Sequence, residues 1–274
     1  MIRGIRTRLA VALIAALAIA GIAAGCGGGS STTGGGASDL GLISDNTLQV
    51  GSDIPYPPFE EGRSPSTYTG FDIDLVDEIA KRLKVTPKIE DTSFDTIFRD
   101  LAQGKFDMVA SATTITPERQ KTVDFSMPYY DSLQSLAVKK GSDIKTTSDL
   151  AGKTVGAQKG TTGADYAQNK TDAASVRTYP EVDSAFNALE AGQVDAVIND
   201  LPSSEQAIKG KPDLQIVQDI STGEEYGFAF NKNNPGLRDA VNKQLKAIID
   251  DGTYVTIYKK WFHKEPPKGF QPSS

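Results

Sequence analysis

The stretch AGQVDAVIND at residues 191–200 decides the fold, because it nearly repeats AQGKFDMVAS at residues 102–111. At an offset of 88 residues, five identical pairs align: Asp95 with Asp183, Phe98 with Phe186, Leu101 with Leu189, Gly104 with Gly192 and Asp107 with Asp195. We interpret the two copies as one helix–turn–strand unit used twice. The alternative is that any two amphipathic helix-to-strand units look alike. Each copy ends where a strand meets a loop, at Ser111-Ala112 and at Asn199-Asp200, and ligands bind at such strand ends in open α/β sheets.

The chain alternates between strand-like and helix-like segments from Thr47 onward. Apolar residues recur at helical spacing in the second kind and in short runs in the first. This alternation predicts an α/β fold with parallel-rich sheets covered by helices. The predicted strands are 47–51, 84–90, 106–110, 153–157, 175–179 and 194–198, and the predicted helices are 71–83, 95–104, 162–169, 181–192 and 235–252.

Two further strand-like segments, SLQSLAVKK at 132–140 and EYGFAFN at 225–231, bracket the second series of strands and helices. We predict that they form a two-strand hinge between two lobes with a cleft between them. Residues 47–136 and 226–265 are assigned to lobe 1 and residues 137–225 to lobe 2. A C-terminal tail follows at residues 266–274.

The N-terminus has the pattern of an export signal. Residues 1–25 carry three arginines, an apolar run and small residues, which predicts a signal peptide. Cys26 follows directly and resembles the lipobox cysteine of bacterial lipoproteins, although Ala23 stands where leucine is usual. Residues 26–46 then read as a flexible, lipid-anchored linker. We expect an extracytoplasmic protein held at a bacterial cell membrane by lipid on Cys26; the alternative is a secreted protein with an incidental cysteine.

Composition excludes several classes of protein and site. The formal net charge of −6 argues against nucleic-acid binding, which needs Lys and Arg to neutralise phosphates. Cys26 is the only cysteine, so an internal disulfide is impossible. His263 is the only histidine, which argues against a zinc site and a His-based catalytic triad. No metal or other cofactor is expected.

A candidate receptor for a carboxylate lies in SATTITPERQK at residues 111–121. Thr116 and Pro117 predict a helix start, which places Arg119 in its first turn beside a loop of small residues. That loop offers backbone N–H groups and the hydroxyls of Thr113 and Thr114, while Arg119 can grip a carboxylate with two N–H groups. The alternative is an ordinary surface arginine.

Asp200 ends a strand that is otherwise apolar, at the position that matches the receptor loop in the other copy. A carboxylate there can accept an ammonium group, and a ligand that carries both charges is a zwitterionic α-amino acid. The alternative is a helix cap before Leu201-Pro202.

Six motifs, in this order, resemble the polar amino-acid-binding proteins of ABC importers, the type 3 solute-binding family. They are VGSDIPYPPFE, YTGFDIDLVDEIAKRL, TTITPERQKTVDFSMPYY, VGAQKGTTGADY, GQVDAVIND and DGTYVTIYKKWF, and they span residues 47–263. The resemblance implies a two-lobed, periplasmic-binding-protein-like fold of type II that closes on its ligand.

The resemblance also implies roles for individual residues. Arg119 and Thr114 would bind the carboxylate together with the N–H of Thr162, and Asp200 would bind the ammonium. Tyr56 and Phe94 would sandwich the side chain, with Asp53 as a polar contact. Ala112 stands where some members have serine, which leaves a backbone contact only. Ser111, Gln158 and Asn199 are further candidates for contacts to the side chain.

The function expected from these residues is capture of a polar L-amino acid and its delivery to an ABC permease by a monomeric binding protein. Glutamine, arginine, lysine and histidine are favoured over acidic ligands. An enzyme of the arogenate or prephenate dehydratase type, or a ligand-sensing receptor component, would use the same fold. The retained pair Arg119 and Asp200 argues against the enzyme, because it would hold an unreacted zwitterion.

Overall fold

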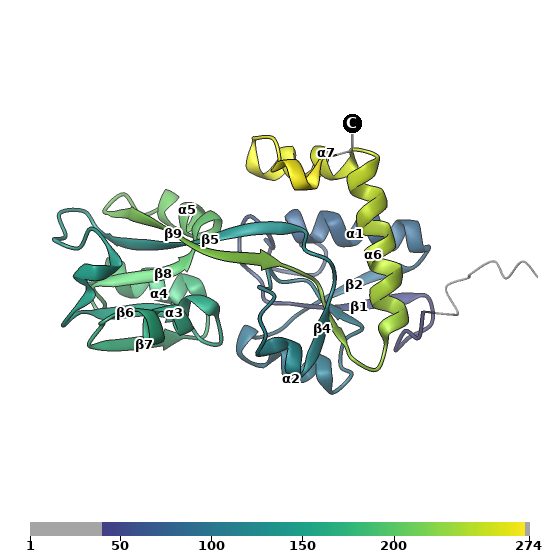
Figure 1. The fold of residues 1–274 in the computed structure, drawn as a ribbon, viewed down its shortest axis with the longest axis horizontal. Coiled ribbons are helices and arrows are strands. Elements are labelled where there is room, and N and C mark those ends of the chain that lie inside the picture. Colours follow the sequence, from purple (N-terminus) through teal and green to yellow (C-terminus); the bar gives the residue numbers. More distant parts are fainter. Residues whose placement is uncertain (1–39, 272–274) are drawn as a thin grey trace, which may run out of the picture. The chain divides into compact units, whose positions relative to one another are not determined.

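The computed structural model describes residues 40–271, so the predicted signal peptide, Cys26 and residues 27–39 of the predicted linker lie outside the described part. The described strands form two five-stranded sheets, which we call the first and second sheets. Their strand orders are β2-β1-β3-β10-β4 and β7-β6-β8-β5-β9 (Figure 1). The α/β architecture predicted from the sequence is therefore confirmed.

The first sheet is built around β1 (Thr47–Ser52). This strand pairs in parallel with β2 (Thr86–Asp91) and β3 (Met108–Val109). An antiparallel strand, β10 (Ala229–Asn231), lies between β3 and β4 (Val123–Phe125). Its helices are α1 (Phe71–Leu83), α2 (Phe94–Ala102), α6 (Pro235–Asp250) and α7 (Thr253–Phe262).

The second sheet repeats this plan around β6 (Thr154–Gln158), which pairs in parallel with β7 (Ser175–Tyr179) and β8 (Ala196–Asp200). Two antiparallel strands, β5 (Tyr130–Lys139) and β9 (Leu214–Tyr226), complete it. Its helices are α3 (Thr162–Lys170), α4 (Val182–Glu190) and α5 (Leu201–Lys209). Both sheets are thus mixed, because the returning strands add antiparallel pairs to the predicted parallel set.

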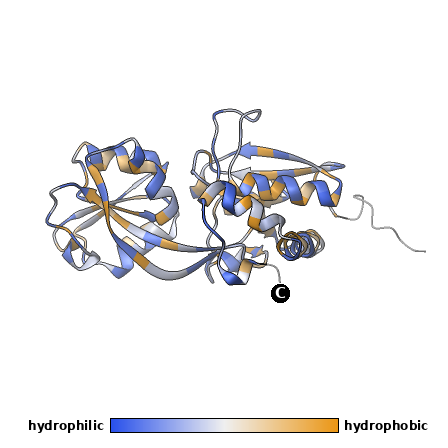
Figure 2. Cartoon of the chain, turned by 90° about the horizontal axis from the view of Figure 1, so that it is seen from above, coloured by the Kyte–Doolittle hydropathy of each residue, from blue (hydrophilic) through white to orange (hydrophobic). Residues whose placement is uncertain are grey.

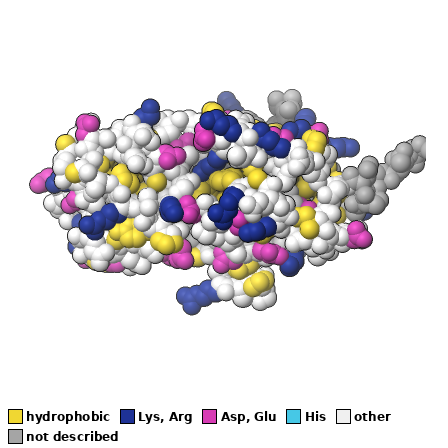
Figure 3. Space-filling model, turned by 90° about the horizontal axis from the view of Figure 1, so that it is seen from below, with side chains coloured by type: hydrophobic (Ala, Val, Ile, Leu, Met, Phe, Trp, Pro, Cys, Tyr) yellow, Lys and Arg dark blue, Asp and Glu magenta, His cyan; other side chains and the backbone are white. Residues whose placement is uncertain are grey.

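Apolar residues concentrate where helices and strands face one another, as Figure 2 shows. Apolar residues at helical spacing form one face of α1. Of these, Ile73, Val76, Ile79 and Ala80 are buried, and Leu83 is partly buried. In the view of Figure 3, basic and acidic side chains are interspersed rather than gathered into a patch of one sign. No helix within residues 40–271 is long and apolar enough to cross a membrane.

The predicted internal repeat is present in the structure. Helices α2 and α4 begin and end at matching positions of the two copies, and Gly104 and Gly192 follow with φ of 78° and 71°. The carboxylate of Asp107 accepts a hydrogen bond from the N–H of Gln49 on β1 (2.8 Å), and that of Asp195 accepts one from Thr154 on β6 (2.7 Å). Each aspartate therefore fixes the start of the neighbouring strand in the same way.

The second predicted crossing strand differs from the prediction, because β9 begins at Leu214 and overlaps the predicted segment 225–231 only at Glu225 and Tyr226. Strands β5 and β9 pair antiparallel from Tyr130 opposite Tyr226 to Lys139 opposite Leu214 (Figure 1). The segment 225–231 is not one strand, because β9 ends at Tyr226 and β10, from Ala229, belongs to the first sheet. The exact lobe boundaries stay a prediction.

Both ends of the described chain pack more closely than predicted. Residues 40–46, assigned to the flexible linker, contact the folded body. The side chain of Asn234 at the start of α6 donates to the carbonyls of Leu40 and Gly41, and Ile43 N–H donates to Asp107. In the predicted tail, Phe270 is buried with its ring centroid 5.5 Å from that of Tyr254. Apolar residues inside both polar-looking segments account for the difference.

Candidate functional site

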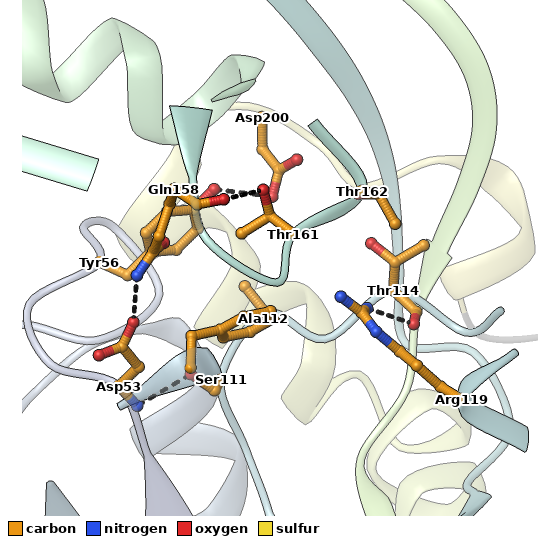
Figure 4. Close-up of a pocket in the computed structure, with 11 residues that line it drawn as sticks. Asp53, Tyr56, Ser111, Ala112, Thr114, Arg119, Gln158, Thr161, Thr162 and Asp200 are labelled. Atoms are coloured by element: carbon orange, nitrogen blue, oxygen red, sulfur yellow. Dashed lines mark hydrogen bonds between the residues drawn. The ribbon is translucent and has the colours of Figure 1, made fainter. Parts of the chain in front are cut away.

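A cavity with about 300 Å³ of empty space, part of it open to solvent, lies among the loops that follow strands of the two sheets. It is lined by Asp53, Tyr56, Phe94, Ser111, Ala112, Thr114, Arg119, Gln158, Thr161, Thr162 and Asp200 (Figure 4). Ten of the eleven candidates from the sequence are thus brought together. Asn199 is not among the lining residues, and Thr161 is an addition.

Arg119 enters the cavity from a short helix, as predicted; the helix is of the 3-10 type and spans Arg119–Lys121. The Thr116 hydroxyl still accepts from the N–H of Arg119 (3.2 Å). The guanidinium donates to the carbonyls of Thr114 (2.8 Å) and Gly160 (3.1 Å), and its carbon lies 4.6 Å from the centroid of the Phe98 ring. Burial lowers the pKa of Arg119 to about 10, against the opposing charges of Asp200 and Glu224, so it remains a cation at neutral pH.

The loop after β3 is held rigidly. Ala112 has a left-handed φ of 46°, and its N–H donates to the buried carboxylate of Asp72 (3.0 Å). The Ser111 hydroxyl accepts from the N–H of Asp53 (2.9 Å). Beyond them, the N–H of Thr114 has no acceptor within the described residues. The loop therefore presents the Thr114 N–H beside Arg119, and the Ala112 N–H, which the sequence analysis counted as available, is already used.

The second group of free N–H donors lies at the start of α3. The Thr161 hydroxyl caps this helix by accepting from Ala164 N–H (3.2 Å), and it donates to the Gln158 carbonyl (2.8 Å). The N–H groups of Thr162 and Gly163 have no acceptor within the described residues. A helix N-terminus with free N–H groups attracts anions, so this end of the cavity favours a carboxylate.

Asp200 is a buried acid and not a helix cap. It stands at the N-cap position of α5, yet its side chain makes no capping hydrogen bond. Its carboxylate instead accepts from the hydroxyls of Tyr56 (2.7 Å) and Tyr226 and from the amide of Gln134. Burial, followed by the charge of Glu224, raises the pKa of Asp200 to about 6. Because burial disfavours the charged form of Asp200, a bound cation would stabilise its carboxylate.

Asn199 supports the cavity from behind. Its side-chain oxygen accepts from the Tyr56 hydroxyl (3.1 Å), and its amide donates to the Ser204 hydroxyl (3.3 Å). Asn199 was predicted to contact the ligand; it is not among the residues that line the cavity, and such a contact stays a prediction. Its side chain and that of Asp200 both reach the hydroxyl of Tyr56.

Asp53 lies at the opposite end of the cavity from Arg119 (Figure 4). Gln158, on the end of β6, donates to its carboxylate (2.5 Å) and to the Pro180 carbonyl (3.0 Å). Burial raises the pKa of Asp53 to about 7, the Gln158 hydrogen bond opposes this, and the charges of Asp91 and Glu181 raise it further. No basic side chain hydrogen-bonds to Asp53 within the described residues, so this end of the cavity also favours a cation.

A second pair of acids lies beneath the loop, outside the cavity. Glu60 and Asp72 are fully buried, and three of their four oxygens lack a partner if both are treated as ionised. The fourth, on Asp72, accepts from Ala112 N–H and the Tyr129 hydroxyl (2.6 Å). Burial, and then the charge of Asp72, raise the pKa of Glu60. A protonated Glu60 that donates to the free oxygen of Asp72 would pair two of these three oxygens, and the other Asp72 oxygen still holds the loop.

Sequence reasoning missed Gln134 on β5 and Glu224 on β9. The Glu224 carboxylate accepts from the hydroxyls of Thr114 and Thr162, both at 2.9 Å, and lies 3.2 Å from the Gln134 amide nitrogen. Gln134 lies in the predicted crossing strand 132–140, where a polar side chain beside buried positions was the available signal. Glu224 lies one residue before the predicted segment 225–231, and no pattern marked it.

The arrangement can hold a molecule with one negative and two positive groups. Anion donors gather at Arg119 and the start of α3, while Asp200 and Asp53 accept cations. Within residues 40–271 no group of three His, Cys, Asp or Glu side chains could hold a metal ion.

Comparison with known proteins points to one family. The model of the bacterial extracellular solute-binding proteins, family 3, matches residues 48–264. ABC transporter arginine-binding protein 1 of Escherichia coli (strain K12) is 32% identical over 228 residues, which cover 81% of this chain and 93% of the relative.

Two solved structures are similar over most of the chain. An ancestral arginine-binding protein bound to arginine has a TM-score of 0.75 and 40% identity, covering 79% of this chain and 98% of its own. An ancestral arginine-binding protein bound to glutamine has a TM-score of 0.77 and 40% identity, covering 80% and 99%. At this identity the similarity extends beyond the fold.

Proposed function

We propose that this chain, which belongs to the bacterial extracellular solute-binding proteins of family 3, captures an L-amino acid in the cavity and delivers it to an ABC permease. The observation that carries the proposal is that Arg119 and Asp200 line one cavity, although Arg119 lies between strands β3 and β4 of the first sheet and Asp200 ends β8 of the second. A zwitterion satisfies both charges at once. The relatives named as amino-acid-binding proteins support the same reading.

The ligand's carboxylate would face Arg119, the N–H of Thr114 and the start of α3. Its ammonium would face Asp200. In this orientation the side chain extends between Tyr56 and Phe94 toward Asp53, the third charged residue of the cavity wall.

The side chain is proposed to be cationic, with L-arginine as the best candidate. The ionised cavity wall carries two acids, Asp53 and Asp200, and one base, Arg119. A ligand with a net charge of +1 neutralises the cavity, whereas a neutral side chain leaves Asp53 buried without a counter-ion, which is costly. The similar proteins bind arginine in one structure and glutamine in another, so L-glutamine, whose amide could pair with Gln158, is the second candidate.

A binding role is favoured over an enzyme of the dehydratase type. Arg119 and Asp200 would hold both charges of an intact amino acid, and the Escherichia coli relative is named as an ABC transporter arginine-binding protein. Incubation with arogenate separates the two, since turnover would support the enzyme. Anchoring through lipid on Cys26 and a monomeric state are further parts of the proposal.

Thermal unfolding with each of the twenty L-amino acids tests the proposal. A ligand at 100 times its dissociation constant stabilises the folded state by about 2.7 kcal/mol. We expect L-arginine to raise the midpoint most, followed by lysine, histidine or glutamine. No stabilisation by any amino acid, in protein shown to be folded, would contradict it.

A further inference from the structure

Glu224 connects the two sides of the cavity without lining it. Its carboxylate accepts hydrogen bonds from Thr114, on the loop after β3, and from Thr162, the first residue of α3, each at 2.9 Å. The amide nitrogen of Gln134 lies 3.3 Å and 3.2 Å from its two oxygens. Thr114 and Thr162 themselves line the cavity, so Glu224 lies directly behind two of its polar groups.

The hydroxyl protons of Thr114 and Thr162 determine whether this side of the cavity donates or accepts hydrogen bonds. A hydroxyl has one proton and two lone pairs, and a carboxylate can only accept. Because Thr114 and Thr162 donate their protons to Glu224, their hydroxyls can offer only lone pairs to a ligand. The Gln134 amide donates to Asp200 and Glu224 and lies 3.3 Å from the Thr162 hydroxyl oxygen, so its protons are engaged and Thr162 keeps one lone pair for a ligand.

This arrangement affects the carboxylate and the ammonium of a bound amino acid differently. A wall of lone pairs repels a carboxylate oxygen and accepts an ammonium proton. The carboxylate must then rely on Arg119 and on the backbone N–H groups of Thr114 and Thr162. The Thr114 hydroxyl was predicted to bind the ligand's carboxylate. Its hydrogen bond to Glu224 instead leaves it able only to accept, which favours the ammonium.

We infer that Glu224 is a positioning residue that turns the hydroxyls of Thr114 and Thr162 into acceptors and thereby selects ligands with an α-ammonium group. The inference rests on the proposed function and adds a determinant of specificity to it. Glu224 acts through the two threonines and through its charge beside Asp200. It need not touch the ligand.

A different role for Glu224 predicts the opposite result. Its carboxylate could instead occupy the place of the ligand's carboxylate and compete with it for the two hydroxyls. Removing the charge would then strengthen binding, whereas loss of the proposed positioning weakens it.

The test compares L-arginine with 5-guanidinopentanoate, which has the same side chain and carboxylate but no α-ammonium. Glu224→Gln removes the charge beside Asp200 and replaces one of the two acceptor oxygens with an N–H donor, which weakens the hold of residue 224 on the two hydroxyl protons. We expect its affinity for L-arginine to fall at least tenfold and its affinity for 5-guanidinopentanoate to change less than threefold. Glu225→Gln is the matched control, because it removes the same charge from the next residue, which is exposed and makes no side-chain hydrogen bond in the described structure. It should bind both compounds as the native protein does.

Thr114→Val provides a second variant, since it removes one hydroxyl without changing a charge. It should lose affinity for L-arginine and keep affinity for 5-guanidinopentanoate. Glu224→Gln that binds L-arginine as tightly as the native protein, or more tightly, would overturn the inference and leave the proposed function intact. Native protein that binds no amino acid in the same calorimetric series would overturn the proposed function and this inference with it.

Discussion

The hydroxyl of Tyr56 donates a 2.7 Å hydrogen bond to the carboxylate of Asp200, 144 residues later in the chain. Tyr56 lies in the loop after β1 of the first sheet, and Asp200 ends β8 of the second. The same hydroxyl lies 3.1 Å from the Asn199 side chain. One aromatic residue of the proposed ligand site thus also orients the acid that would bind the ammonium.

Arg119→Ala should weaken L-arginine binding by roughly 2–5 kcal/mol, because a carboxylate enclosed in the cavity loses its charged partner. Isothermal calorimetry measures the change. Arg99→Ala is a suitable control, since Arg99 is exposed on α2 and pairs only with the neighbouring Asp100. Equal affinities for the Arg119 variant and the native protein would argue against a carboxylate site at Arg119.

Asp200→Asn should reduce affinity for L-arginine far more than for 5-guanidinopentanoate. The amide keeps the size of the side chain but removes the charge that faces the ammonium. We expect a loss of roughly 2–5 kcal/mol for the amino acid. Parallel calorimetric titrations give both values, and equal losses for the two compounds would mean that Asp200 acts on the structure and not on the ammonium.

Asp53 should make cation binding depend on pH. Its pKa of about 7 in the ligand-free protein means that it is increasingly protonated as the pH falls below 7, whereas a cationic side chain binds the ionised form. The affinity for L-arginine should therefore fall as the pH is lowered from 8 to 5.5. Asp200, with a pKa of about 6, adds to this loss at the acidic end.

The variant Asp53→Asn separates the two acids. It should bind L-arginine more weakly at pH 8 and show a flatter pH profile, while its affinity for L-glutamine should change little. A profile as steep as that of the native protein would remove Asp53 from the proposed side-chain site.

Glu60→Gln should become more stable relative to the native protein as the pH rises. A carboxyl whose pKa is raised in the folded state contributes stability below its unfolded pKa and loses it as the pH rises through the folded value. Glu60 has such a raised pKa through burial and the nearby Asp72. Gln cannot ionise, so it avoids this loss, which amounts to at most about 1.4 kcal/mol per pH unit for one proton.

Urea unfolding of ligand-free protein between pH 5 and 9 measures this difference. Glu61→Gln, at the next residue, should run parallel to the native protein at every pH. A constant difference between Glu60→Gln and the native protein across the range would show that Glu60 stays in one protonation state throughout.

Local patterns determined the elements and most of the proposed site. The 88-residue repeat identified α2–β3 and α4–β8 and aligned Asp107 with Asp195, because helix period and glycine turns are encoded by neighbouring residues; the shared role of the two aspartates came from the structure. The loop and strand end that close the two repeat copies indicated Arg119 and Asp200 as ligand-binding residues. The family resemblance indicated Tyr56, Phe94 and Thr162. The strand break after Tyr226 and the packing of residues 40–46 were not foreseen.

Tertiary structure alone decided which polar groups are already engaged. The hydroxyl protons of Thr114 and Thr162 go to Glu224, the Ala112 N–H goes to Asp72, and Asn199 stands behind the wall. These contacts join residues from 40 to 143 positions apart. The sequence determines which side chains can donate or accept, but the direction of each hydrogen bond depends on the partner that folding brings within 3 Å, and no local pattern contains that partner.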